Sequence, residues 1–153
     1  MKLTLNQRVA EALVFTDLIN GSPVSGIQNF FFITGTAAYG LPGVNPGDID
    51  FVIRREHFNR LRSGETGFWE ESTYFPNSSF KIEKNGIIYN AVVVDSELEY
   101  SAWWNATVAV RSLAQCLHPG PGLLARKATR VKLFEGLLSE FSNPKSQFNA
   151  PSL

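Results

Sequence analysis

The sequence has few of the residues that mark secreted, zinc-binding or membrane-spanning proteins. Its 153 residues include one cysteine, Cys116, so neither an intrachain disulfide nor a cysteine cluster for zinc can form. No apolar run approaches the roughly 18 residues of a membrane-spanning helix. Met1-Lys2 leads into a polar, helix-like pattern rather than an apolar signal sequence. We therefore expect a cytoplasmic protein that does not enter a membrane.

An excess of charge of one sign is also missing. Lysine and arginine together number 14, and so do aspartate and glutamate. A protein that coats nucleic acid without sequence preference needs an excess of cations, so this balance argues against that class but leaves room for a local basic patch. What is present is a large apolar fraction of 44%, with 12 phenylalanines and three tryptophans. We expect one domain over residues 1–142 and a polar tail over residues 143–153.

Hydrophobic periodicity and turn residues predict the order of the elements. Asn85-Gly86 between two β-rich runs is a strong hairpin signal. The predicted helices cover residues 4–20, 56–61, 97–116 and 123–141, and the predicted strands cover residues 30–34, 48–53, 78–83 and 87–94. This order indicates an α+β fold with a small mixed β-sheet and helices packed on one side.

Two acids on the second predicted strand are the strongest functional signal. Asp48 and Asp50 stand at positions i and i+2, so their side chains point to the same face, with backbones roughly 6.6–6.8 Å apart. Burial of unpaired carboxylates is costly. Oxygen ligands of this kind suit Mg²⁺, so a divalent cation carrying a polyphosphate is the expected partner. The alternative is that both acids cap loops or pair with arginines.

The residues around this pair carry a family resemblance. Gly35-Thr36 follows an apolar strand, eleven residues intervene, and Asp48-Ile49-Asp50 comes next. This stretch resembles the signature of the polymerase-beta-like nucleotidyltransferase superfamily, with Thr36 in place of the usual serine. The resemblance is sharp over residues 30–53, and beyond them it extends only to the order of elements. It implies a nucleotidyltransferase-like fold that moves a nucleoside monophosphate from a nucleoside triphosphate such as ATP to an acceptor.

The resemblance also implies roles for individual residues. Gly35 and Thr36 would contact phosphate, and Asp48 and Asp50 would hold Mg²⁺ or Mn²⁺. Basic residues on late helices of such enzymes contact the triphosphate, which points to Lys127 or Arg130. A solvated helix face is the competing interpretation of these two cations.

The third carboxylate of the family is the main departure. The matching position on the strand over residues 87–94 is Asn90, whose neutral amide cannot take up a proton at neutral pH. Asn90 is therefore either a neutral third ligand or a satisfied buried amide, and Glu83 is a candidate substitute across the hairpin.

The functional prediction is a metal-dependent nucleotidyltransferase with an acceptor that is a small molecule, a protein or an RNA end. The alternative is a catalytically weakened domain that acts as a nucleotide sensor or a protein-binding module. Whether it works with a protein partner or a second copy of itself is left open.

Overall fold

The computed structural model describes residues 31–41, 44, 47–64, 69–74, 76–84, 86–116 and 122–143. The predicted helix over residues 4–20 and the tail beyond Asn143 lie outside them, so these two predictions and the domain boundary stay predictions. Within the described residues, no helix is long and apolar enough to cross a membrane.

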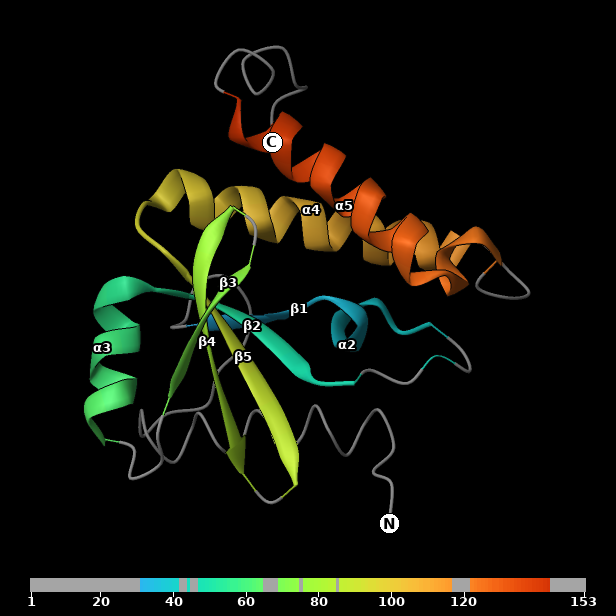
Figure 1. Cartoon of the computed structure of the whole chain (residues 1–153). Helices are drawn as coiled ribbons and strands as arrows, with labels where there is room; N and C mark the ends of the chain where they lie inside the picture. Colours follow the sequence, from blue (N-terminus) through green and yellow to red (C-terminus); the bar gives the residue numbers. More distant parts are fainter. Residues whose placement is uncertain are drawn as a thin grey trace.

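A five-stranded mixed sheet forms the centre of the molecule (Figure 1). Its spatial order is β1-β2-β5-β4-β3. The strands β2 and β5 are parallel neighbours, and the other neighbouring pairs are antiparallel. The strands are β1 (Phe31–Thr34), β2 (Ile49–Arg54), β3 (Glu70–Tyr74), β4 (Asn77–Lys84) and β5 (Ile87–Val94).

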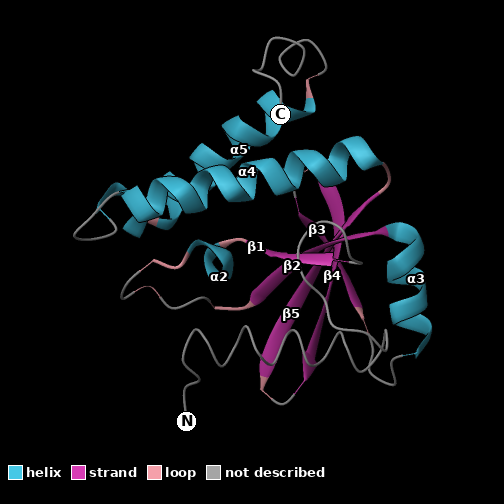
Figure 2. Ribbon diagram, turned by 180° about the vertical axis from the view of Figure 1, so that it is seen from behind, coloured by secondary structure: helices cyan, strands magenta, loops and turns pink. Residues whose placement is uncertain are grey.

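Helices cover both faces of this sheet (Figures 1 and 2). The helices α4 and α5 pack against each other over one face, and α3 lies against the opposite face. The short helix α2 follows β1 directly. The helical elements are α2 (Thr36–Tyr39), α3 (Arg55–Gly64), α4 (Glu97–Cys116), the 3₁₀ turn η1 (Gly122–Ala125) and α5 (Lys127–Ser142).

Alternation along β2 shows why two cores form. Ile49, Phe51 and Ile53 point toward α3 and are at most 1% exposed. Val52, between them, points toward α4 and α5 and is fully buried. A strand with apolar residues on both faces must be covered on both sides. Asp50 has the same orientation as Val52, so it lies on the α4–α5 side of the sheet.

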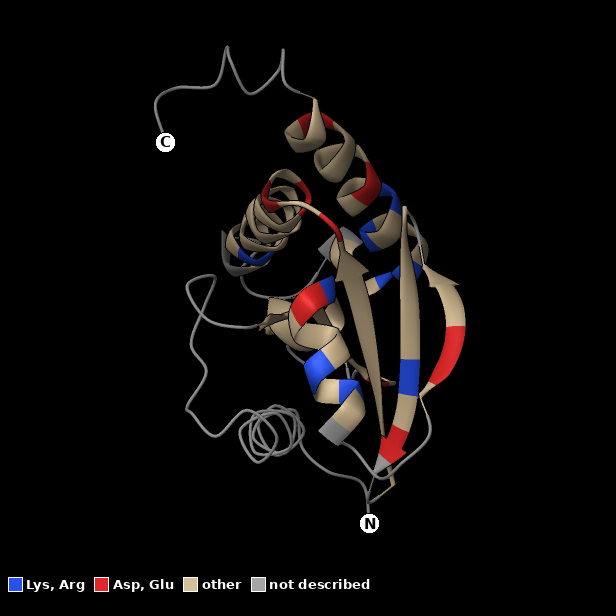
Figure 3. Ribbon diagram, turned by 90° about the vertical axis from the view of Figure 1, so that its left-hand side faces the viewer, with Lys and Arg blue, Asp and Glu red and all other residues tan. Residues whose placement is uncertain are grey.

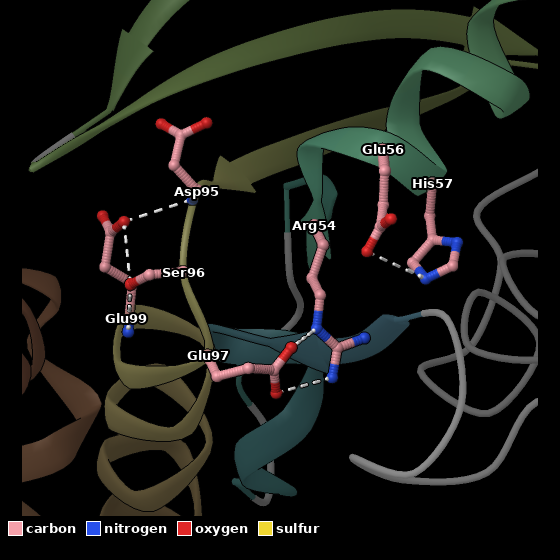
Figure 4. Close-up of polar contacts among 7 residues, drawn as sticks. All are labelled: Arg54, Glu56, His57, Asp95, Ser96, Glu97 and Glu99. Carbon is pink, nitrogen blue, oxygen red and sulfur yellow. Dashed lines mark hydrogen bonds and ion pairs between the residues drawn. The ribbon is translucent and has the colours of Figure 1, made fainter.

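The start of α4 is fixed by a capping box and by an ion pair to the end of β2 (Figure 4). The Ser96 hydroxyl oxygen accepts a hydrogen bond from the Glu99 backbone N–H at 3.2 Å, and the Glu99 carboxylate accepts one from the Asp95 N–H at 3.1 Å. The first bond satisfies a backbone donor that the first helical turn leaves open, and the second ties the helix to the residue before its N-cap. Arg54 donates to Glu97 at 3.1 Å, which ties the helix to the sheet.

The structure confirms the predicted fold class, α+β with a small mixed sheet. The predicted strand over residues 30–34 agrees with β1, the predicted hairpin with the antiparallel pairing of β4 and β5, and the predicted helix over 97–116 with α4. The helices do not all lie on one side, because Phe58 and Leu61 of α3 bury the second face. The sequence analysis missed β3, whose polar residues show no apolar alternation. The predicted helix over residues 123–141 is two elements, because Arg126 has extended backbone angles.

Candidate active site

One pocket of about 260 Å³ opens between the sheet and α5. Parts of β1, α2, β2, β3, β5, α4 and α5 contribute to its wall. All the site residues that the sequence predicts line it: Gly35, Thr36, Asp48, Asp50, Asn90, Lys127 and Arg130. The structure therefore brings together residues from four separate segments of the chain, while their chemical roles remain predictions.

The parallel pairing of β2 with β5 sets the acids beside the predicted third ligand. Asp50 and Asn90 are direct register partners. The Asn90 amide nitrogen donates to Asp50 Oδ1 at 3.2 Å and also to Asp48 Oδ2. In this arrangement the amide nitrogen of Asn90 faces the two acids, so Asn90 does not offer them an acceptor. It is the hydrogen-bond donor that joins the two carboxylates.

Burial changes the acid–base behaviour of Asp50. Loss of water raises the pKa of this carboxyl to about 8, and the neighbouring negative charge of Asp48 contributes to the increase. The hydrogen bond from Asn90 and the positive charge of Lys127 oppose it. A cation bound here would oppose both effects, because it favours the ionised form of each carboxyl.

Gly35 is required by the position of Asp50. Its φ of 70° and ψ of −160° lie in a region that residues with a side chain rarely adopt. A Cβ atom at this position would stand 2.6 Å from Asp50 Oδ2, closer than non-bonded atoms approach. The sequence analysis assigned this glycine to close contact with phosphate. The structure shows a second reason, since the missing side chain makes room for the acid.

Arg130 is buried and links α5 to the turn after β1. Its guanidinium donates to the backbone oxygens of Leu124 at 2.8 Å and Ala125 at 2.9 Å, and to Thr36 Oγ1 at 3.4 Å. Its side chain is 8% exposed, so the solvated-face interpretation is wrong for this residue. Lys127, by contrast, is exposed at the start of α5 and on the rim of the pocket.

Positive charge gathers in the first turns of α5 (Figure 3). Arg126 and Lys132 are exposed, as Lys127 is. The helix α2 has only four residues, so its dipole adds little charge at the Gly35 turn. Positive charge for an anion in this pocket therefore comes mainly from side chains of α5.

An aromatic wall closes the pocket, and the sequence analysis did not predict it. Tyr39, Tyr74, Trp103 and Phe134 line this side. The Trp103 ring lies 5.0 Å from Phe134 and 6.0 Å from Tyr74, measured between ring centroids. Burial and the two site acids raise the pKa of Tyr74 to about 12, so its phenol stays protonated. No sequence signal marked Tyr74, because it lies on β3, a strand that the sequence did not predict.

The other acids near the site have different positions. Glu83 is exposed and lies opposite Ile88, so it does not share the register of Asn90. Asp95 pairs with Arg55, and Glu97 pairs with Arg54. Over the described ranges, no group of three or more histidine, cysteine, aspartate or glutamate side chains comes together. The acidic part of the candidate site therefore consists of Asp48 and Asp50.

Comparison with known proteins gives little further guidance. No protein-family model matches the sequence. No curated protein matches it. Among solved structures, the Cid1 poly(U) polymerase with MgGTP bound aligns with a TM-score of 0.43 and 12% identity, over 72% of this chain and 36% of that chain. This chain thus spans about a third of the length of that protein. Similarity at this level does not assign a function, and the functional evidence lies in the pocket itself.

Proposed function

We propose that this chain binds a nucleoside triphosphate with Mg²⁺ or Mn²⁺ in the pocket and transfers the nucleoside monophosphate to an acceptor, releasing pyrophosphate. The acceptor would be a hydroxyl or phosphate group of a small molecule, a protein or an RNA end. The observation that supports this proposal is the convergence of Asp48 and Asp50 with the Gly35-Thr36 turn and Lys127 around a single pocket.

The residues present fit a divalent cation. Asp48 and Asp50 supply carboxylate oxygens, the ligands that Mg²⁺ prefers, and Asn90 holds both acids together from one side. The space that Gly35 leaves open allows the Asp50 carboxylate to reach this position. When bound, such a cation would neutralise phosphate charge and assist departure of the pyrophosphate.

The remaining polar groups suit the phosphates. Lys127 would hold the triphosphate as a mobile point charge at the rim. The Thr36 hydroxyl accepts from Arg130, so its own hydrogen is available for a phosphate oxygen. Arg130 would act mainly by holding this turn and η1 in place, because its guanidinium already donates to backbone oxygens. Among the aromatic residues that line the pocket, Tyr74 is partly exposed and would offer a surface for the ribose or base.

A second function has a specific observation in its favour. The Asn90 amide stands at the position where the resembling enzymes carry a third acid, and it donates to both remaining carboxylates. It cannot accept the proton of an attacking hydroxyl. This favours nucleotide binding without efficient transfer, as in a nucleotide sensor or a nucleotide-controlled protein-binding module.

Labelled transfer distinguishes the two functions. Each of the four [α-³²P]NTPs would be incubated with the protein, Mg²⁺ or Mn²⁺ and a pool of acceptors from cell lysate. The enzyme proposal expects label on an acceptor with the wild type and none with Asp50→Asn. Asp95→Asn is the matched control, because it removes a carboxylate that pairs with Arg55 outside the pocket. Nucleotide binding without transfer across all four nucleotides would exclude the enzyme and support the sensor.

A further inference from the structure

We infer that Asn90 limits this site to a single divalent cation, held by Asp48 and Asp50 together with the nucleotide. The inference rests on the proposed nucleotide site and specifies how many cations it takes. Two observations support the inference: the orientation of the Asn90 amide and the charges of the residues around it.

The Asn90 amide nitrogen competes directly with a second cation. It lies within hydrogen-bond distance of one carboxylate oxygen on Asp48 and one on Asp50. A carboxylate accepts only, and an amide NH₂ group donates only, so this orientation is the one that two facing carboxylates select. An oxygen of each acid is therefore already engaged by a neutral donor.

Rotation of the amide would not create a second site. If the amide turned its oxygen inward, one cation would gain a third oxygen ligand, but the protein would still supply only two negative charges, because the amide is neutral. Two closely spaced cations repel each other strongly at short range, so a protein that supplies two carboxylates holds a second cation less tightly than one that supplies three.

Within the part of the chain that the structure describes, no third acid joins Asp48 and Asp50. On β4, Glu83 is exposed and opposite Ile88, not opposite Asn90. The β4 residue directly paired with Asn90 is Lys81, an exposed cation and not an acid. On α5, Lys127 and Arg130 line the same pocket, and Lys127 acts electrostatically on Asp50. A second cation would thus meet positive charge on the α5 side of the pocket.

The consequence concerns what the site can do with a nucleotide. One cation suffices to hold the triphosphate against the two acids. A separate ion at the acceptor side is the usual means of activating an attacking hydroxyl in two-metal sites, and this site would lack it. Binding is therefore expected to be retained while transfer is slow. Asn90→Asp would restore a third carboxylate in register with Asp50.

Electron paramagnetic resonance of Mn²⁺ tests the inference without reliance on activity. The protein, in excess over a non-hydrolysable nucleoside triphosphate analogue, is titrated with Mn²⁺. Two Mn²⁺ ions about 3.5–4 Å apart couple magnetically and give a spectrum distinct from that of an isolated ion. We expect one uncoupled Mn²⁺ per bound nucleotide in the wild type, and a coupled pair in Asn90→Asp. The second ion should bind the variant at least about tenfold more tightly, given the strength of one added charge at close range.

Asn59→Asp is the matched control, because it makes the same substitution at an exposed position of α3. It should leave one uncoupled ion. A coupled pair in the wild type would overturn the inference whether or not Asn90→Asp folds, while leaving nucleotide binding intact. A single uncoupled ion in a folded Asn90→Asp would also overturn it. Failure of the wild type to bind the analogue would refute the proposed function instead.

Discussion

Replacement of Asp50 by asparagine should make the protein more stable while it removes the proposed function. In the folded protein, burial and Asp48 hold the pKa of Asp50 at about 8, whereas its ordinary value is 3.8. The folded state therefore retains a proton that the unfolded chain releases. Asparagine fills the same volume without a charge, and its oxygen can still accept the hydrogen bond from Asn90.

The size of the expected gain in stability follows from the shift in the pKa of Asp50. About four pKa units at about 1.4 kcal/mol each set a ceiling of about 6 kcal/mol on the cost of ionised Asp50 in the folded state. Relaxation and water entry around buried charges reduce such costs, so we expect roughly 2–4 kcal/mol. For a chain of this length that corresponds to a melting temperature higher by about 5–15 °C.

The pH dependence determines how the stability difference between Asp50→Asn and the wild type changes. Below pH 3.8 both states are protonated and the variant gains nothing. As the pH rises from there to about 8, only the unfolded wild type loses the proton, so wild-type stability falls. Above pH 8 the difference is constant. The advantage of Asp50→Asn should therefore grow between about pH 4 and pH 8 and then level off.

Chemical denaturation in EDTA at several pH values between 5 and 9 measures this difference. Asp95→Asn is the control of opposite sign, because the hydrogen bond from Arg55 lowers the pKa of Asp95. Its effect should be a small loss of stability at neutral pH. If Asp50→Asn is no more stable than the wild type at pH 9, or if its advantage does not change with pH, the argument from burial is refuted.

The remaining predictions concern the pocket. Gly35→Ala should destabilise the protein by about 1–3 kcal/mol and abolish nucleotide binding, because the new Cβ meets the Asp50 carboxylate at 2.6 Å. Gly136→Ala, which meets nothing within 4 Å, should instead stabilise by about 0.5–1 kcal/mol in the same denaturation experiment. Lys127→Gln should weaken nucleotide binding at low salt and make it less dependent on salt, as calorimetry can measure. Lys132→Gln, at an exposed position of α5, should not; equal effects of the two substitutions would remove Lys127 from the site.

The sequence alone predicted the part of the site whose residues are close together along the chain. Asp48 and Asp50 are separated by one residue, and period-two alternation places both on one face. Only the family resemblance predicted that Asn90 lies near the two acids, because local hydrophobic periodicity does not determine which strands are neighbours in the sheet. The donor role of Asn90 was not predicted, since the direction of an amide depends on which groups face it.

The features of the site that the sequence did not predict depend on tertiary packing. Nothing about the polar strand β3 indicates that Tyr74 reaches the pocket, because its neighbours have no apolar alternation. Arg130 was predicted to contact the triphosphate, with a solvated helix face as the alternative, but its buried hydrogen bonds to two backbone oxygens of η1 were not predicted. Two helical segments with an extended residue between them were not distinguishable by periodicity from one long helix.

The order of the strands also has a consequence for folding. Asp50 and Asn90 are neighbours across parallel strands, but α3, β3 and β4 separate them along the chain. The ladder between β2 and β5 closes a long loop, which makes it a late and slow step relative to local hairpins. The site therefore cannot assemble before β2 pairs with β5. Nucleotide binding would report this long-range pairing, and a chain in which only the local hairpins have formed would not present the acids joined by the amide.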